Sequence, residues 1–126
     1  MFNNDKRFDI DLKWGQVYER QLADMLQNKK VEVKSERDLW TRTGNIAIEF
    51  ESRGIPSGIA TTEAEFWFHN LVKDDVVVAS IVLPTETLRN YIKVRKPYVV
   101  KGGDDLTSKL YLVRLNELFG DLGRLA

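Results

Sequence analysis

An acidic and a basic side chain stand two residues apart in the segment "KKVEVKSERD", residues 29–38. Valines alternate with Glu32 and Lys34, which is the pattern of a β-strand. Side chains of a strand alternate between its two faces, so Glu32 and Lys34 share one face and Val31 and Val33 share the other. The strand therefore presents a carboxylate and an amine side by side.

A second acidic pair follows in "IAIEFES", residues 46–52. Its alternation predicts a strand that turns Glu49 and Glu51 to one face. The other face carries the apolar residues that we expect in the core, Ile46, Ile48 and Phe50. The segment "DLWTRTGN" before it ends in Gly44-Asn45, a turn signal, so the two strands are expected to form a β-hairpin.

Two kinds of chemistry suit these side chains. If the polar faces of the hairpin coincide, Glu32 and Glu49 gather near Lys34. Clustered carboxylates repel one another unless a cation neutralises them, and oxygen ligands suit Mg²⁺ or Mn²⁺. Alternatively, Lys34 forms cross-strand ion pairs with the glutamates on a solvated face, each worth a few tenths of a kcal/mol. Spacing alone favours the ion pairs.

A helix is expected before the hairpin and several elements after it. Apolar residues at a helical period, with Asp11 as a possible N-cap, predict a helix from Asp11 to about Gln27. After a Gly- and Pro-containing loop, Thr62 and Glu65 resemble a capping box and predict a helix in "EAEFWFHNL". The run "VVVASIVL" predicts a central strand that is covered on both faces.

The C-terminal part adds three further expected elements. They are a helix in "TETLRNYIKV", a strand in "KLYLVRL" and a terminal helix in "NELFGDLGRL". The order helix, β-hairpin, helix, strand, helix, strand predicts an α/β fold with a mixed central sheet flanked by helices.

The segment from Asp9 to Trp67 resembles the PD-(D/E)XK nuclease superfamily, in particular small phage-type members. The similarity lies in the order of "VEVK", "TGN", "IEFESRG" and "SGIATT" after a glutamate on the first helix. The resemblance implies a restriction-endonuclease-like core. It places the E-x-K pair of the superfamily on Glu32 and Lys34, and its first-helix glutamate on Glu19.

The resemblance leaves one acidic position open. The superfamily has a further carboxylate before its E-x-K pair, and Asp24 has a suitable spacing but falls in the expected first helix. Either "LADML" is a short strand, or Glu49 supplies the carboxylate. The implied metal ligands are Glu32 with Asp24 or Glu49 and the carbonyl of Val33.

These implied roles describe a Mg²⁺- or Mn²⁺-dependent endonuclease that hydrolyses phosphodiester bonds in DNA. Glu19 would bind the ion through water or fix a second ion, and Lys34 would orient the attacking water or stabilise the charged phosphorus centre. Three arginines could hold flanking phosphates, namely Arg37, Arg42 and Arg53. The resemblance also implies a homodimer and no organic cofactor.

Composition sets the limits within which these expectations stand. The chain has 126 residues, 19 Lys plus Arg against 19 Asp plus Glu, and no cysteine. The length predicts one nuclease-like domain, residues 1–126, and the absence of cysteine excludes disulfides and favours a reducing compartment. The N-terminus lacks an apolar signal region and no apolar run is long enough to span a membrane, so we expect a cytoplasmic protein, in the host cytoplasm if phage-encoded.

Basic and aromatic side chains allow two interpretations each. A balanced net charge creates no overall field for a polyanion, so the basic residues around 29–42 and 89–101 are either solvated charge or a nucleic-acid footprint. The second group comprises Arg89, Lys93, Arg95, Lys96 and Lys101. Trp40 would stack a base or pack over the hairpin, and the single histidine, His69, is expected to be partly buried near a helix end rather than to act as a base.

Two other functions compete with the nuclease. One is a nucleic-acid-binding relative without catalytic activity, which is favoured if Asp24 lies on a helix and no metal binds. The other is a phage structural or interaction module whose charged hairpin is only a solvated face.

Overall fold

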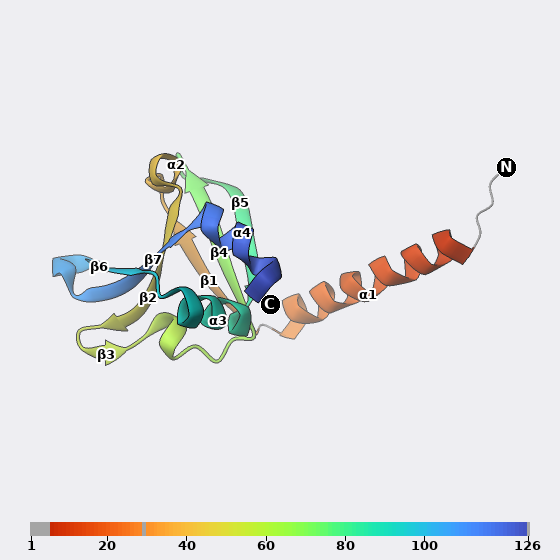
Figure 1. Cartoon of the computed structure of the whole chain (residues 1–126), viewed down its shortest axis with the longest axis horizontal. Coiled ribbons are helices and arrows are strands. Elements are labelled where there is room, and N and C mark those ends of the chain that lie inside the picture. Colours follow the sequence, from red (N-terminus) through yellow and green to blue (C-terminus); the bar gives the residue numbers. More distant parts are fainter. Residues whose placement is uncertain (1–5, 29, 126) are drawn as a thin grey trace. The chain divides into compact units, whose positions relative to one another are not determined.

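The computed structural model describes residues 6–28 and 30–125 (Figure 1). Contacts between residues divide the chain into two compact units, Met1–Val31 and Glu32–Ala126, and each unit is described by itself. The first unit contains one long helix. The second contains two β-sheets and the remaining helices.

The first unit is built by helix α1, Lys6–Asn28. The helix predicted from Asp11 to Gln27 is therefore confirmed, and it begins earlier in the chain than expected. The segment "LADML" lies inside α1, so a strand at that place is wrong and Asp24 lies on a helix. Among the described helices, none combines the length and the apolar character that crossing a membrane requires.

One sheet of the second unit contains three strands in the order β1-β4-β5. The strands β4 and β5 are antiparallel and joined at Asp74 and Asp75, whose positive φ angles of 51° and 63° suit a tight hairpin turn. In Figure 1 the arrows of the neighbouring strands β1 and β4 point the same way. The strands are β1 Val31–Glu36, β4 Phe66–Lys73 and β5 Val76–Pro84.

The other sheet has four antiparallel strands in the order β3-β2-β7-β6. Its longest strands, β2 and β7, pair from Asn45 opposite Arg114 to Ser52 opposite Ser108, with a bulge between Glu49 and Glu51. The strands are β2 Asn45–Ser52, β3 Ile55–Pro56, β6 Tyr98–Gly102 and β7 Ser108–Arg114.

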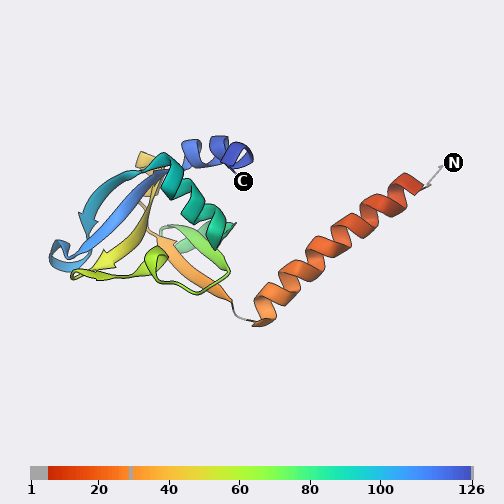
Figure 2. The same cartoon turned by 60° about the horizontal axis from the view of Figure 1, so that its bottom comes forward.

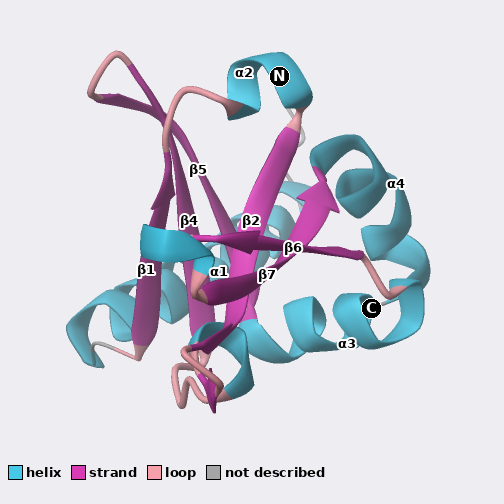
Figure 3. Cartoon of the chain, turned by 90° about the vertical axis from the view of Figure 1, so that its left-hand side faces the viewer, coloured by secondary structure: helices cyan, strands magenta, loops and turns pink. Residues whose placement is uncertain are grey.

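Helices connect and flank these sheets (Figures 2 and 3). Arg95 of α3 and Asp121 of α4 form an ion pair, so these two helices lie side by side. The elements are α2 Trp40–Thr43, η1 Gly58–Ala60, α3 Thr85–Arg95, η2 Asp104–Leu106 and α4 Leu115–Leu125, where η denotes a 3₁₀-helix. The fold class is therefore α/β, with a three-stranded and a four-stranded sheet flanked by helices.

A single apolar core joins both sheets to α3 and α4. The inward positions predicted for Ile46 and Ile48 are confirmed, and Phe50 is half-buried against the same core. The remaining core is contributed by the other elements through Ile59, Trp67, Leu71, Ile81, Leu83, Leu88, Tyr91, Val113 and Leu118.

The predicted hairpin between the "VEVKSE" and "IAIEFES" strands is wrong. Strand β1 pairs with β4, and β2 pairs with β3 and β7, so the two neighbours in sequence belong to different sheets. Helix α2 fills the connection between them, and its Gly44 takes the left-handed conformation that ends the helix. The Gly44-Asn45 signal therefore marks a helix end rather than a hairpin turn.

The helix predicted in "EAEFWFHNL" is also wrong, because most of this segment forms strand β4. Trp67, His69 and Leu71 are buried while the residues between them are half-buried, which is the period of a strand. The hydroxyl of Thr62 accepts a hydrogen bond from the Ala64 N–H, so it closes a local turn and does not cap a helix.

The predicted central strand "VVVASIVL" is found as β5, but at the edge of its sheet. Residues 76–80 are exposed, and only Ile81 and Leu83 are buried within the strand. The continuous apolar run predicts burial on both faces, and this prediction is wrong. The predicted α3, β7 and α4 are confirmed, whereas β6 and β3 were not predicted.

The core predicts a large difference between two isoleucines in the same sheet. Ile48→Ala should lower the free energy of unfolding by about 2–5 kcal/mol, because Ile48 is 0% exposed and its loss leaves a cavity. Ile55→Ala is the matched control, since Ile55 is 67% exposed. Its effect should stay within about 0.5 kcal/mol in urea denaturation. Equal losses in the two variants would contradict the assigned core.

Candidate functional site

The polar face predicted for strand β1 exists and is the more protected face. Glu32, Lys34 and Glu36 are half-buried, whereas Val33 is 56% exposed. Hydrophobicity alone would predict that Val33 is protected and that the charged side chains are exposed. The reason lies in the contacts made by Glu36.

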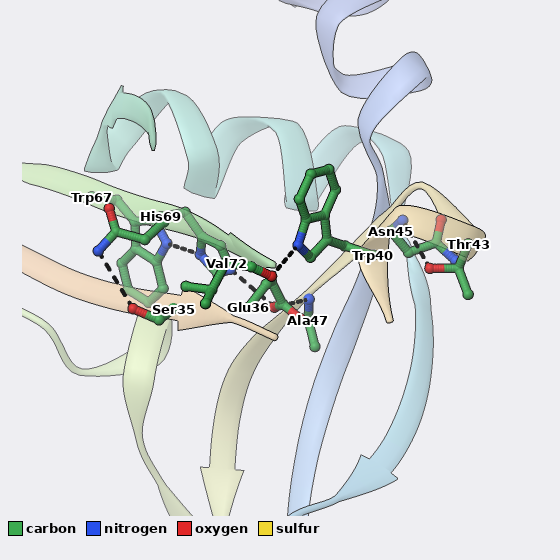
Figure 4. A network of polar contacts seen from close by, with 10 residues as sticks. Ser35, Glu36, Trp40, Thr43, Asn45, Ala47, Trp67, His69 and Val72 are labelled. Carbon is green, nitrogen blue, oxygen red and sulfur yellow. Dashed lines mark hydrogen bonds and ion pairs between the residues drawn. The ribbon is translucent and has the colours of Figure 1, made fainter. Parts of the chain in front are cut away.

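The carboxylate of Glu36 joins three strands (Figure 4). Its Oε1 accepts a hydrogen bond from the Ala47 N–H of β2 at 2.7 Å and lies 2.9 Å from Nε2 of His69 on β4. The other ring nitrogen of His69, Nδ1, accepts a hydrogen bond from Nε1 of Trp67 at 3.0 Å. An indole N–H can only donate, so His69 carries its hydrogen on Nε2 and donates it to Glu36.

This arrangement makes His69 a structural residue. The residue is 1% exposed and both ring nitrogens are used within the protein. The expectation that it does not act as a base agrees with this geometry, although it lies in a strand and not near a helix end. Strands β1 and β2 do not pair, so the Glu36 contact to Ala47 takes the place of a ladder between them.

Trp40 adds a second link at the same end of the sheets. Its Nε1 donates a hydrogen bond to the carbonyl of Val72 at 2.8 Å, and the ring packs against the core. Asp38 accepts a hydrogen bond from the Asp74 N–H at 2.9 Å. Of the two interpretations of Trp40, packing is the one realised.

Glu49 is positioned by the loop that follows its strand. Ser57 donates a hydrogen bond from its hydroxyl to Oε2 of Glu49 at 2.9 Å, and its N–H donates to the carbonyl of Phe50 at 3.0 Å. Gly58 has a φ of +54°, and a Cβ at this residue would collide with the carbonyl oxygen of Glu49. The "SG" of the loop is therefore required for its close approach to Glu49.

The ion pairs expected between Lys34 and the glutamates are not formed. Glu51 instead pairs with Lys109 of the adjacent β7 at 3.3 Å. Within residues 6–28 and 30–125, Glu32 and Lys34 have no ion-pair partner. Strand β1 runs toward α2 and strand β2 runs away from it. Lys34 and Glu49 therefore each lie two residues farther from α2 than the contact between Glu36 and Ala47.

The acidic residues expected around a metal ion are distributed over both units. Glu19 and Asp24 lie on α1, and Glu32 and Glu49 belong to the second unit. Across the part of the chain that the structure describes, no three His, Asp or Glu side chains gather so as to hold a metal ion. The expected cluster of several carboxylates is therefore not seen among these residues.

The three arginines expected to hold phosphates are exposed but separated. Arg37 and Arg42 lie on either side of the start of α2, whereas Arg53 follows β2. The eight residues of β2 span about 23 Å, so Arg53 stands at the opposite end of this strand from Arg42. Arg37 and Arg42 therefore lie near one end of β2, and Arg53 lies at the other end.

A pocket of about 400 Å³ lies at the C-terminal end of α3, where sequence analysis placed no site. Its lining includes Asn45, Tyr91, Lys96, Tyr98, Arg114 and Glu117. The sequence signal that could have located it is the basic group around residues 89–101, since Arg95 and Lys96 of this group line the pocket. Arg114 comes from a distant strand, and spacing along the chain gave no sign of it.

Tyr91 contributes the most perturbed group of this pocket. Burial raises the pKa of its hydroxyl, Glu117 and Asp121 raise the pKa further, and Arg95 opposes them. The hydroxyl therefore keeps its proton to a higher pH than an exposed tyrosine does.

No family model matches the chain, and no curated protein or solved structure matches it either.

The Glu36 network predicts a stability loss that is specific to this carboxylate. Glu36→Ala would leave the Ala47 N–H and the buried Nε2–H of His69 without an acceptor. Each unpaired group costs about 1–3 kcal/mol, so the free energy of unfolding should fall by about 2–4 kcal/mol in urea denaturation. Glu36→Gln keeps an acceptor oxygen and should lose less. Glu51→Ala, which removes a partly exposed ion pair, should lose no more than about 1 kcal/mol.

The raised pKa of Tyr91 predicts a pH effect on stability. The unfolded chain releases this proton near pH 10, before the folded protein does. The contribution of Tyr91 to stability is therefore fully present below about pH 10 and is lost as the pH rises through the folded pKa. Urea midpoints measured from pH 8 to 11 should fall less steeply in Tyr91→Phe than in the wild type. Tyr98→Phe is the matched control, and identical slopes for wild type and Tyr91→Phe would contradict the prediction.

Proposed function

We propose that the chain is an endonuclease that hydrolyses phosphodiester bonds in DNA with the help of Mg²⁺ or Mn²⁺. The observation that carries the proposal is the hydrogen bond from Ser57 to Glu49. It joins the "IEFESRG" and "SGIATT" segments, two of the motifs on which the resemblance to PD-(D/E)XK nucleases rests. Reacting groups need supporting residues that fix their orientation, and Ser57 provides such support for Glu49.

Strand β1 supports the same proposal. Glu32 and Lys34 lie on its half-buried face and have no ion pair among the described residues. In the proposal Lys34 orients the attacking water or stabilises the charge that develops on the phosphate. Arg37 and Arg42, at the α2 end of both strands, hold neighbouring phosphates.

The available donors suit a particular kind of metal site. Glu32, Glu49 and the carbonyl of Val33 offer oxygen ligands. Oxygen donors of this kind suit Mg²⁺, which commonly keeps several waters and shares oxygens with a substrate phosphate. When bound, such an ion polarises the phosphate and lowers the pKa of a bound water.

The finer fold and the assembly belong to the proposal as well. A restriction-endonuclease-like core is compatible with a mixed sheet flanked by helices, but the pairing of β1 with β4 departs from the expected hairpin. A homodimer would supply the second site that cleavage of two antiparallel DNA strands requires. The cytoplasm is the compartment in which such an enzyme meets DNA.

A second candidate is a DNA-binding relative that does not cleave. Two observations favour it. Asp24 lies on a helix, and a cluster of three acidic or histidine side chains is lacking among residues 6–28 and 30–125. This candidate shares the DNA ligand with the first and differs from it in chemistry.

Nicking of supercoiled plasmid with Mg²⁺ or Mn²⁺ tests the nuclease proposal. Lys34→Ala and Glu49→Gln should lower the rate about 100-fold or more while changing DNA affinity little, because both groups act on the reacting centre. Ser57→Ala should lower it about tenfold, since Ser57 only positions Glu49. A chelator should stop the reaction in the wild type.

Exposed residues supply matched controls. Lys101→Ala and Glu63→Gln remove the same charges away from β1 and should nick at the wild-type rate. Metal-dependent nicking that survives in Lys34→Ala and Glu49→Gln would disprove the assigned site. If the wild-type protein binds DNA without nicking it, the second candidate is supported. If it neither binds nor nicks DNA, an interaction module is supported.

A further inference from the structure

The pocket at the end of α3 has the properties of a nucleotide site. We propose that it binds one nucleotide of a single-stranded nucleic acid, with the base stacked on Tyr98 and the phosphate held by Lys96 and Arg114. This inference rests on the proposed function for the class of ligand. The pocket is formed by residues other than those proposed to react.

The register of the four-stranded sheet places Tyr98 and Arg114 on one surface, and Lys96 lines the same pocket from the end of α3. Tyr98 lies opposite Leu112, and Arg114 is two residues further along β7, so Tyr98 and Arg114 are diagonal neighbours on one face. Diagonal neighbours in an antiparallel pair are about 7–8 Å apart. A base on the ring of Tyr98 would therefore leave its phosphate within reach of the Arg114 guanidinium.

Tyr98 is presented as a stacking surface. Its side chain is 75% exposed, the most exposed among the large hydrophobic side chains that the structure describes. An exposed aromatic ring beside cations is the arrangement with which proteins bind unpaired bases along a charged backbone. A duplex keeps its bases stacked on one another, so the ring favours a single strand.

Lys96 occupies a conformation that a lysine rarely adopts. It ends α3 with φ 49° and ψ 65°, the left-handed region, and its N–H donates to the carbonyl of Ile92 at 2.8 Å. Glycine is preferred at such a helix end, and another residue costs about 1 kcal/mol or more. Lys96 lines the pocket at this helix end, and Pro97 stiffens the connection to Tyr98.

The charges of the pocket leave two cations for a ligand. Arg95 is held by Asp121 at 2.9 Å and forms part of the wall. Arg114 lies 3.6 Å from Glu117 and is 67% exposed, so this contact is loose. Lys96 has no ion-pair partner within the described residues. Lys96 and Arg114 are therefore the groups that a phosphate would meet.

The pocket and the proposed reaction site share a strand. Asn45, at the pocket, and Glu49 lie on the same face of β2, four residues and about 13 Å apart. A single strand held at Tyr98 and directed along this face would pass close to Glu49. The pocket would then act as an anchor for the substrate strand.

Fluorescence anisotropy with a labelled oligothymidine of 12 nucleotides tests the inference with the full chain in the presence of chelator. Tyr98→Ala should weaken binding about tenfold, which corresponds to about 1.4 kcal/mol and lies within the range for one stacked base. Tyr98→Phe keeps the ring and should bind within about twofold of the wild type. Lys96→Gly and Arg114→Gln should each reduce the slope of log affinity against log salt by about 0.7.

Controls separate this site from general charge and from the proposed reaction. Lys101→Gln removes a neighbouring charge outside the pocket and should retain the wild-type affinity. Lys96→Gly also relieves the left-handed residue, so a loss of binding with equal or higher stability would not reflect unfolding. Affinity unchanged in Tyr98→Ala and Lys96→Gly, or equal binding of a duplex of the same length, would overturn the inference. Because chelator prevents cleavage, these outcomes are independent of the nicking assay.

Discussion

The structure depends on one half-buried carboxylate. Oε1 of Glu36 accepts hydrogen bonds from Ala47 of one sheet and from His69 of the other, and Trp67 fixes the tautomer of that histidine. A buried polar network of this kind specifies one arrangement only when every member is satisfied, and here each ring nitrogen and the carboxylate have partners. Strands β1 and β2, which are neighbours in sequence but not in a sheet, are joined through this contact.

The same contact decides which face of β1 is protected. Because Glu36 points toward the other sheet, Glu32 and Lys34 are turned to that half-buried side and Val33 to solvent. On β2, the loop containing Ser57 and Gly58 closes on Glu49. The polar side chains of the proposed reaction site are thus oriented by structural hydrogen bonds made elsewhere, and the pocket at Tyr98 lies further along the face of β2 that carries Glu49.

Particular elements show where sequence patterns sufficed. The helical period of α1 and the alternation in β7 and β2 are local patterns, and each predicted its own element. The alternation in β2 also predicted the inward position of Ile48. Patterns failed where partners were distant. The segment of β4 has apolar residues that satisfy both a helical and a strand period, and its contacts with β1 and β5 select the strand. Strand β5 is apolar yet lies at an edge of its sheet. The prediction of a central strand failed because the residues of a strand do not show how many neighbouring strands it has.

The sequence by itself determined the helices α1, α3 and α4, the alternating faces of β1 and β2, and the residue types available for chemistry, since these follow from periodicity and side-chain identity. Only the tertiary structure decided that β1 pairs with β4, that Ser57 holds Glu49, and that Lys96, Tyr98 and Arg114 line one pocket. Each of these depends on contacts between residues far apart in the chain. Their free energy arises from burial and hydrogen bonding in the assembled core, which no local pattern records.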